Sequence, residues 1–289
     1  MNIDKRKGLI WGALLADAYS LRAECMDKQE TLNTLLPKKH LQTHLNKHAE
    51  NFTLYGEQSI WLLKHLNEAK MYDPFDYAKL WQKQMHTYEG NKDEASSISL
   101  QNLESGKSFM ACGSESQNLS VVGRHAPLLF KLDNIDELLE SIKLHNCLTH
   151  FTKETLDASK YISEVALAML YDLDVEATLK ERAEFYGDLV KEEVSTAFSL
   201  KNNPKHEVLK HLADSPNVKG GLALTVYLLL NYHHDFPKLL KMNLLAGGDS
   251  SARGMIAGML VGARYGFDTI KPSWIEELNN YEVLNALIQ

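Results

Sequence analysis

Glycine recurs at every fourth position along one apolar, helix-patterned stretch near the end of the chain. The positions are Gly254, Gly258, Gly262 and Gly266. Each glycine inside a helix costs about 1 kcal/mol relative to alanine, so a helix with several on one face needs a compensating contact. Gly8, Gly12 and Ala16 repeat the spacing near the N-terminus. We therefore predict that the two small-residue faces pack closely together near the centre of the domain.

The start of the glycine-striped helix also predicts a binding site. Gly247, Gly248 and Asp249 directly precede it. The Asp249 carboxylate can accept hydrogen bonds from the first N–H groups of the helix as an N-cap. The remaining N–H groups and the helix dipole favour an anion at this end. Gly266, the last of the four glycines, can end the helix.

Helical periodicity dominates the rest of the sequence, which predicts an all-α fold. We expect a compact single-domain multi-helix bundle over residues 1–289, because no Pro/Gly/Ser-rich linker divides it and 44% of its residues are hydrophobic. Asp73-Pro74 and Thr152 predict helix starts, whereas Leu119–Val122 fits a short strand. The expected helices cover residues 4–20, 58–70, 74–88, 134–146, 152–171, 174–200, 204–214, 218–232, 235–245, 250–265 and 273–287. The expected loops cover residues 25–57, 105–127 and 246–251.

The composition of the chain favours some kinds of binding partner and cellular compartment over others. A net charge of −7 does not favour nucleic-acid binding, and no apolar run reaches the length of a membrane span. Lys5–Lys7 followed by the apolar Gly8–Ala16 imitates a signal peptide. Cys25, Cys112 and Cys147 are widely spaced, with no Cys-x-x-Cys, which favours free thiols and a cytoplasmic location.

Acidic residues at expected helix ends are the first candidates for chemistry. Glu57 and Asp249 precede apolar helical patterns, and Asp17 and Glu24 lie towards the end of the first helix and beyond it. Three helix ends can bring these carboxylates to one pocket. The alternative is simple helix capping, because acidic side chains stabilise first turns. His40, His44 and His48 have a spacing that can bind Zn²⁺, but their lysine neighbours favour a solvated face.

A series of motifs in fixed order extends over positions 8–266. They are Ala16-Asp17-Ala18 followed by Glu24; Gly56-Glu57-Gln58-Ser59; the Ser114–Gly123 loop followed by Arg124-His125-Ala126-Pro127-Leu128; Thr149-His150; and Gly247-Gly248-Asp249-Ser250-Ser251-Ala252. Together these motifs resemble the ADP-ribosylglycohydrolase family, also called the crystallin-J1-like family. The resemblance implies an all-helical fold and hydrolysis of the bond between C1″ of ADP-ribose and its leaving group. It also implies ADP-ribose-like molecules or ADP-ribosylated substrates as partners.

Departures from the family pattern concern its metal site. The resemblance implies two Mg²⁺ ions between two acidic runs, but this chain has Glu57 and the neutral Gln58 where the family has adjacent aspartates. Ser251 replaces a second C-terminal aspartate, and Ala252 replaces a threonine. Because Mg²⁺ requires hard oxygen ligands, we expect one ion or none and assign no metal ligand.

Two carboxylates can cleave a glycosidic bond without a metal. We predict Glu57 as the base or stabiliser, with Glu24 and Asp249 in support. Arg253 follows Asp249 by four residues on the same helix face, and we expect it to replace part of the metal's charge by pairing with Asp249 or Glu57.

The substrate-binding prediction gathers the remaining motif residues: Asp17, Gln58, Ser59, Asn118, Ser120, Gly123, Arg124, His150, Gly247, Gly248, Ser250, Ser251 and Arg253. Loop N–H groups would hold the ribose or phosphates, and Arg124 would meet a phosphate. Arg124 in a structural ion pair and His150 as a core histidine stay open as alternatives. The leading hypothesis is a hydrolase of an N- or O-glycosidic ADP-ribosyl bond. The alternatives are a catalytically silent relative that binds such nucleotides or a protein partner, and a glycosidase for another nucleoside-like substrate.

Overall fold

The computed structural model describes residues 2–24, 52–69, 71–212, 215–273, 275–278 and 280–289. Throughout these ranges the secondary structure is helical apart from two isolated bridges. The elements are α1 (Ile3–Glu24), α4 (Leu54–Ala69), α5 (Pro74–Thr87), α6 (Glu94–Glu104), η1 (Phe109–Ala111), α7 (Ser120–Gly123), α8 (Ala126–Lys131), α9 (Ile135–Thr149), α10 (Lys153–Leu170), α11 (Val175–Ala183), α12 (Asp188–Leu200), α13 (Lys205–Leu212), α14 (Val218–Tyr232), α15 (Phe236–Ala246), α16 (Ser250–Tyr265), α17 (Phe267–Ile270), η2 (Ile275–Glu277) and α18 (Tyr281–Leu287). The predicted all-α class is confirmed.

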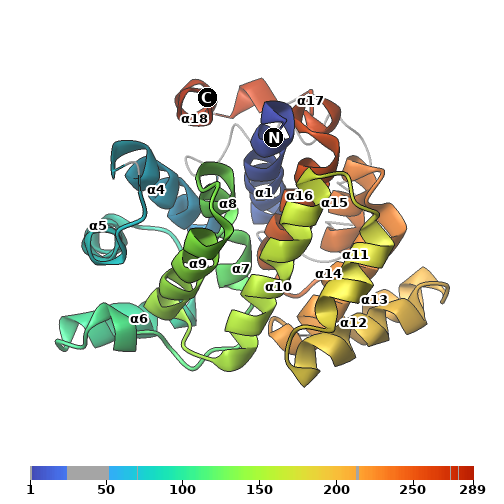
Figure 1. Ribbon diagram of the computed structural model, residues 1–289, viewed down its shortest axis with the longest axis horizontal. Helices are drawn as coiled ribbons and strands as arrows, with labels where there is room; N and C mark the ends of the chain where they lie inside the picture. Colours follow the sequence, from blue (N-terminus) through green and yellow to red (C-terminus); the bar gives the residue numbers. More distant parts are fainter. Residues whose placement is uncertain (1, 25–51, 70, 213–214, 274, 279) are drawn as a thin grey trace.

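Helices α1 and α16 lie side by side at the centre of the fold (Figure 1). They run antiparallel, because Gly8 meets Gly262 and Gly12 meets Gly258. A Cβ atom on Gly12 would lie 2.0 Å from the carbonyl oxygen of Gly258, and one on Gly258 would lie 2.1 Å from that of Gly12. No side chain fits between the two backbones. The predicted packing of the two small-residue faces is therefore confirmed.

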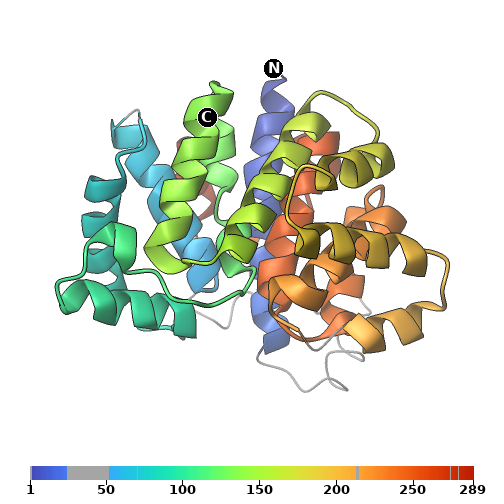
Figure 2. The same ribbon diagram turned by 60° about the horizontal axis from the view of Figure 1, so that its bottom comes forward.

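The other helices cover this central pair from two sides. Helices α4, α5, α6 and α9 lie on one side and α11 to α15 on the other, as the second view also shows (Figure 2). One hydrophobic core runs through both sides and includes Trp11, Trp61 and Trp81, so the predicted core positions of Trp61 and Trp81 are confirmed. No helix in the described ranges has both the length and the apolar character needed to cross a membrane.

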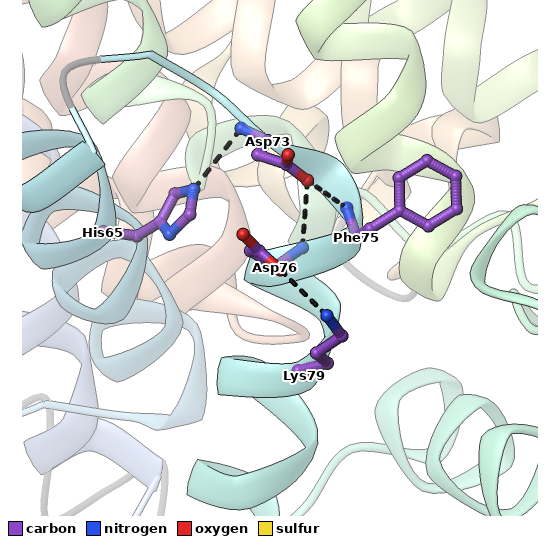
Figure 3. Close-up of polar contacts among 5 residues, drawn as sticks. All are labelled: His65, Asp73, Phe75, Asp76 and Lys79. Atoms are coloured by element: carbon purple, nitrogen blue, oxygen red, sulfur yellow. Dashed lines mark hydrogen bonds and ion pairs between the residues drawn. The ribbon is translucent and has the colours of Figure 1, made fainter.

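Several helix ends follow the sequence signals. The Asp73 carboxylate accepts hydrogen bonds from the N–H groups of Phe75 at 2.9 Å and Asp76 at 3.0 Å (Figure 3). The N–H of Asp73 donates in turn to Nε2 of His65 at 3.4 Å, which joins the start of α5 to α4. Thr152 caps α10. Gly266 ends α16 with a φ of 83°, as predicted.

Other expectations about the elements were wrong. Residues 174–200 form two helices: α11 ends at Ala183, and α12 begins at Asp188 after Gly187, whose backbone is extended. Leu119–Val122 is not a strand: residues from Ser120 onwards form α7, which packs against α16. Helix α6 and most of α8 lie in segments that periodicity left unassigned. Helix α7 lies within the expected loop over residues 105–127, and 273–287 holds η2 and α18 instead of one helix.

Part of the predicted loop over residues 25–57 lies outside the described residues. The described end of this segment includes the first turn of α4, which begins at Leu54. The three spaced histidines and Cys25 all fall in the part that is not described. The zinc alternative therefore stays a sequence prediction.

Candidate active site

The starts of α4 and α16 meet beside the C-terminal half of α1. The Tyr55 hydroxyl, in the first turn of α4, donates to Oδ2 of Asp249 at 3.2 Å. Asp17 of α1 accepts hydrogen bonds from the Thr53 N–H at 2.8 Å and the Thr53 hydroxyl at 2.6 Å. The Ser20 hydroxyl, one turn further along α1, donates to the carbonyl oxygen of Ser250 at 3.1 Å. Helix α1 therefore holds both helix starts in place.

Asp249 accepts hydrogen bonds from three different residues at this junction. Its Oδ1 accepts the N–H of Ala252 at 2.9 Å, which confirms the predicted N-cap. Its Oδ2 accepts from Tyr55 and from Nδ2 of Asn118 at 3.3 Å. Burial raises the pKa of Asp249, although these donors and the charge of Arg253 act in the opposite direction. Desolvation disfavours the charged carboxylate more than its partners favour it.

The other predicted acids occupy different environments. Asp17 is fully buried. A Cβ atom on Gly56 would lie 2.3 Å from Oδ2 of Asp17, so a side chain there would displace this carboxylate. Glu57 is half-buried in the first turn of α4, two residues after Tyr55. Glu24 ends α1, but its side chain lies outside the described part of the structure.

Gln58 points into the protein interior. Its Oε1 accepts hydrogen bonds from Nε1 of Trp81 at 2.8 Å and from the Arg124 guanidinium, and its Nε2 donates to the Ser96 hydroxyl at 3.2 Å. The neighbouring Ser59 is also buried, and its hydroxyl has no hydrogen-bond partner among the described residues. Gln58 therefore joins α4 to α5, α6 and the segment between α7 and α8.

Arg124 is fully buried with neutral partners. Besides Gln58, it donates to Oγ1 of Thr149 at 2.6 Å. Within the described ranges it forms no ion pair, so the structural ion pair considered for it is absent. Burial lowers the pKa of Arg124, and the charge of Asp93 partly offsets this effect. A guanidinium so far from solvent is held by hydrogen bonds to neutral oxygens.

The Gly/Ser-rich loop has one residue that reaches Asp249. Asn118 donates to it, and its own Oδ1 accepts the N–H of Ser120 at 2.7 Å. The Ser120 hydroxyl lies 3.5 Å from Nε2 of His150, which is fully buried. Gly123 is buried against α16, where a Cβ atom would lie 2.5 Å from that of Met255. The residues that follow Asn118 thus belong to the interior.

The loop before α16 is held by Arg253 from within. Gly247 and Gly248 have φ values of 71° and 62°, a region that favours glycine. The buried Arg253 guanidinium donates to the carbonyl oxygen of Gly247 and to Oδ1 of Asn243, the latter at 3.2 Å. It forms no ion pair with Asp249 in the part of the chain that the structure describes; the predicted contact is replaced by these carbonyl oxygens. Burial lowers the pKa of Arg253 to about 10.

Ser250 and Ser251 follow this loop and are both buried at the start of α16. Sequence reasoning missed Tyr55, Thr53 and Asn243 as residues that build the junction. The only available signal was their position, since Tyr55 and Thr53 directly precede the acidic motif at Glu57.

The described residues do not fit a dinuclear magnesium centre. They contain no group of three or more histidine, cysteine, aspartate or glutamate side chains arranged to hold a metal ion. Both oxygens of Asp249 accept from N–H or O–H donors, and the side chain of Gln58 is turned into the interior. Mg²⁺ needs several hard oxygen ligands that face one point.

Comparison with known proteins identifies the family. The model of the family described as ADP-ribosylglycohydrolase matches residues 2–289. The chain belongs to the ADP-ribosylglycohydrolase family. Crystallin J1B from Tripedalia cystophora is 23% identical over 317 residues, covering 99% of this chain and 96% of the relative. A solved structure named as an ADP-ribosylglycohydrolase-related protein complex superposes with a TM-score of 0.71 at 20% identity, covering 98% of this chain and 96% of that one. The resemblance read from the motifs is confirmed.

Proposed function

We propose that this member of the ADP-ribosylglycohydrolase family hydrolyses the glycosidic bond of an ADP-ribosyl group at the junction of α4 and α16, without a dinuclear magnesium centre. One observation carries the proposal. Tyr55, two residues before Glu57 on α4, binds Asp249, so the helix start that carries Glu57 lies against the start of α16. Family membership supports a glycohydrolase.

Acid–base cleavage of a glycosidic bond needs one carboxyl group that donates a proton and one carboxylate that accepts a proton. Burial raises the pKa of Asp249, so this carboxyl keeps its proton to a higher pH than an ordinary aspartate. Asp249 would protonate the leaving oxygen or nitrogen as its bond to C1″ breaks. Glu57 would take a proton from the water that forms the new bond to C1″. The positive end of the α16 helix dipole and the Asn118 loop would bind ribose or phosphate oxygens.

The proposed reaction defines the substrate, the product and the metal requirement. The substrate is an ADP-ribosylated molecule, and ADP-ribose is the product that the junction would bind. One Mg²⁺ ion or none takes part, so chelation would leave most of the activity. A single domain over residues 1–289 and a cytoplasmic location remain predictions of the sequence.

A second function is favoured by a specific observation. Gln58 and Ser251 replace acids of the family pattern, and the Gln58 side chain is committed to interior partners. These changes suit a catalytically silent relative that binds ADP-ribose-like nucleotides or a protein partner. Among the relatives is a protein named as a crystallin, Crystallin J1B.

Calorimetry and a turnover assay separate the two functions. ADP-ribose is titrated into the wild type with Mg²⁺ and with EDTA, and release of ADP-ribose from an ADP-ribosylated peptide is measured in parallel. Turnover in EDTA that is lost in Glu57→Gln supports the hydrolase. Binding without turnover supports the silent relative. Absence of binding and of turnover under every condition contradicts the hydrolase and the nucleotide-binding relative, and turnover that requires Mg²⁺ contradicts the metal-independent mechanism.

A further inference from the structure

A buried chain of polar groups connects Arg124 to the site. Nη2 of Arg124 lies 2.6 Å from Oγ1 of Thr149, which lies 3.0 Å from Nδ1 of His150. Nε2 of His150 lies 3.5 Å from the Ser120 hydroxyl. The N–H of Ser120 then donates to Asn118, whose amide reaches Asp249. We call the four residues Arg124, Thr149, His150 and Ser120 the Arg124 relay.

The direction of the hydrogen bonds along the Arg124 relay is fixed at its first member. A guanidinium only donates, so Oγ1 of Thr149 is the acceptor of that bond. Among the described residues, the only acceptor within reach of the Thr149 hydroxyl proton is Nδ1 of His150. A buried hydroxyl proton without an acceptor is costly. Nδ1 must therefore be unprotonated, which leaves the imidazole proton on Nε2, facing Ser120.

The surroundings keep this imidazole neutral. His150 is fully buried, and the positive charge of Arg124 acts on it. Burial, together with the charges of Arg124 and His125, holds the pKa of His150 well below its usual range. The ring is thus a neutral tautomer with one donor and one acceptor rather than an imidazolium.

The last link determines what Asp249 receives. Because Oδ1 of Asn118 accepts the N–H of Ser120, the amide presents its Nδ2 donor to the Asp249 carboxylate. A shift of Ser120 would move this donor away from Asp249. The position of Ser120 is fixed by its backbone and by the contact of its hydroxyl with His150.

We propose that Arg124 and His150 are positioning residues: through Thr149, Arg124 selects the Nε2–H tautomer of His150, which holds Ser120 and so aims Asn118 at Asp249. The effect on ligand binding rests on the proposed function, whereas the tautomer of His150 does not. Arg124 therefore acts on the site from the interior, without touching the ligand.

Thr149→Val tests the Arg124 relay, because it keeps the shape of the side chain and removes the hydroxyl. Thr225→Val is the matched control: this threonine is also fully buried in a helix, and its hydroxyl donates to the Gly221 carbonyl oxygen in α14. The tautomer of His150 is read by ¹⁵N NMR of histidine-labelled protein. The affinity for ADP-ribose is measured by calorimetry, and Tm by thermal unfolding.

We expect Nδ1 of His150 to be unprotonated in the wild type and in Thr225→Val. In Thr149→Val the proton should redistribute between the two nitrogens, and ADP-ribose should bind about threefold to tenfold more weakly than in Thr225→Val at similar Tm. Thr149→Ser restores the hydroxyl and should restore both readouts.

Three outcomes contradict the proposal. The first is a wild type with Nδ1 protonated. The second is a Thr149→Val variant with an unchanged tautomer, and the third is a changed tautomer with unchanged affinity. If the wild type binds no ADP-ribose while the tautomer behaves as expected, the proposed function is wrong and the selection of the tautomer by Arg124 stands.

Discussion

The contact between α1 and α16 and the polar interior around Arg124 are both buried, yet they are built on opposite principles. The helix contact has no side chains at its closest points, where Gly12 and Gly258 bring backbone against backbone. The interior around Arg124 consists of polar side chains, several of which hydrogen-bond to one another. The helix contact depends on the absence of side-chain atoms between the two backbones. The interior around Arg124 depends on hydrogen bonds between its side chains.

The difference shows which region tolerates change. Backbone atoms in two packed helices cannot move apart locally, so an added methyl group has nowhere to go. The polar interior is incompletely paired: Nε of Arg124, both ring nitrogens of His125 and Nδ1 of His145 lack hydrogen-bond partners among the described residues. We expect substitutions to be most costly in the helix contact and to depend on pH in the polar interior.

The largest effect is expected for Gly258→Ala. Its Cβ atom would lie 2.1 Å from the Gly12 carbonyl oxygen, and separating the helices should lower the free energy of unfolding by at least about 3 kcal/mol, or prevent folding. In the control Gly254→Ala, the nearest atoms are side-chain atoms of Asn243 and Ser20 at 3.0 and 3.1 Å, so the change should stay within about 1 kcal/mol. Urea unfolding measures both, and equal effects would contradict close backbone packing.

Acid should destabilise the polar interior. Burial lowers the pKa of His125 to about 3 from the 6.5 expected in the unfolded chain. Between these values the unfolded state binds more protons, so stability is lost as the pH falls from 6.5 towards 3. For this one group the loss is on the order of 3 kcal/mol at pH 4.

His125→Leu removes this titrating group. The free energy of unfolding should therefore depend less steeply on pH, by the equivalent of about one bound proton. Substitution of the exposed His206 by asparagine is the control and should leave the slope unchanged. Urea unfolding between pH 7 and pH 4 gives the slopes. The same slope in the wild type and in His125→Leu would show that His125 titrates normally in the folded protein.

Substitutions of Gln58 test whether a neutral acceptor holds the Arg124 guanidinium in place. Gln58→Leu leaves Arg124 and Trp81 without their shared acceptor and should cost about 2 kcal/mol. Gln58→Glu keeps an acceptor for both, supplies Arg124 with a carboxylate, and should change stability by less than about 1 kcal/mol. Thermal and urea unfolding of the two variants provide the comparison. If leucine is tolerated as well as glutamate, the interior does not depend on this acceptor.

The smallest effect is expected at the surface ends of the same helix pair. The exposed Asp172 forms ion pairs with Lys5 of α1 and Arg264 of α16, which lower its pKa. A lowered pKa stabilises the fold at neutral pH, and this contribution is lost as the pH falls through the folded value. Asp172→Asn keeps a residue that tolerates the local φ of 64° and should lower Tm only slightly. The difference should vanish in 1 M salt, and a large fall in Tm would contradict this ranking.

The sequence predicted those parts of the fold that depend on local spacing. The glycines of α1 and α16 revealed their contact because a four-residue repeat marks one helix face. The caps Asp73, Thr152 and Asp249 were recognisable because an aspartate or threonine directly before a helical pattern commonly acts as an N-cap. Helix α7 was missed because Val121 and Val122 favour strand locally, whereas packing of Gly123 against α16 imposes a helix.

The candidate site was predicted only in outline. The order of the motifs predicted that Glu57 and Asp249 lie in one site, but no local sequence pattern showed that Tyr55 would join α4 to α16. Nor did spacing show that Arg253 would bind carbonyl oxygens instead of Asp249. The orientation of a long side chain depends on which acceptors other elements bring near it, and these come from distant parts of the chain.

The sequence by itself determined the all-α class, the family and the central helix contact, because each follows from residue types at fixed spacings or in a fixed order along the chain. The tertiary structure decided which polar groups face the site and which face the interior. Gln58 and Glu57 are neighbours in sequence, yet a helix turns them about 100° apart, so Gln58 enters the network of Arg124 while Glu57 stays half-buried.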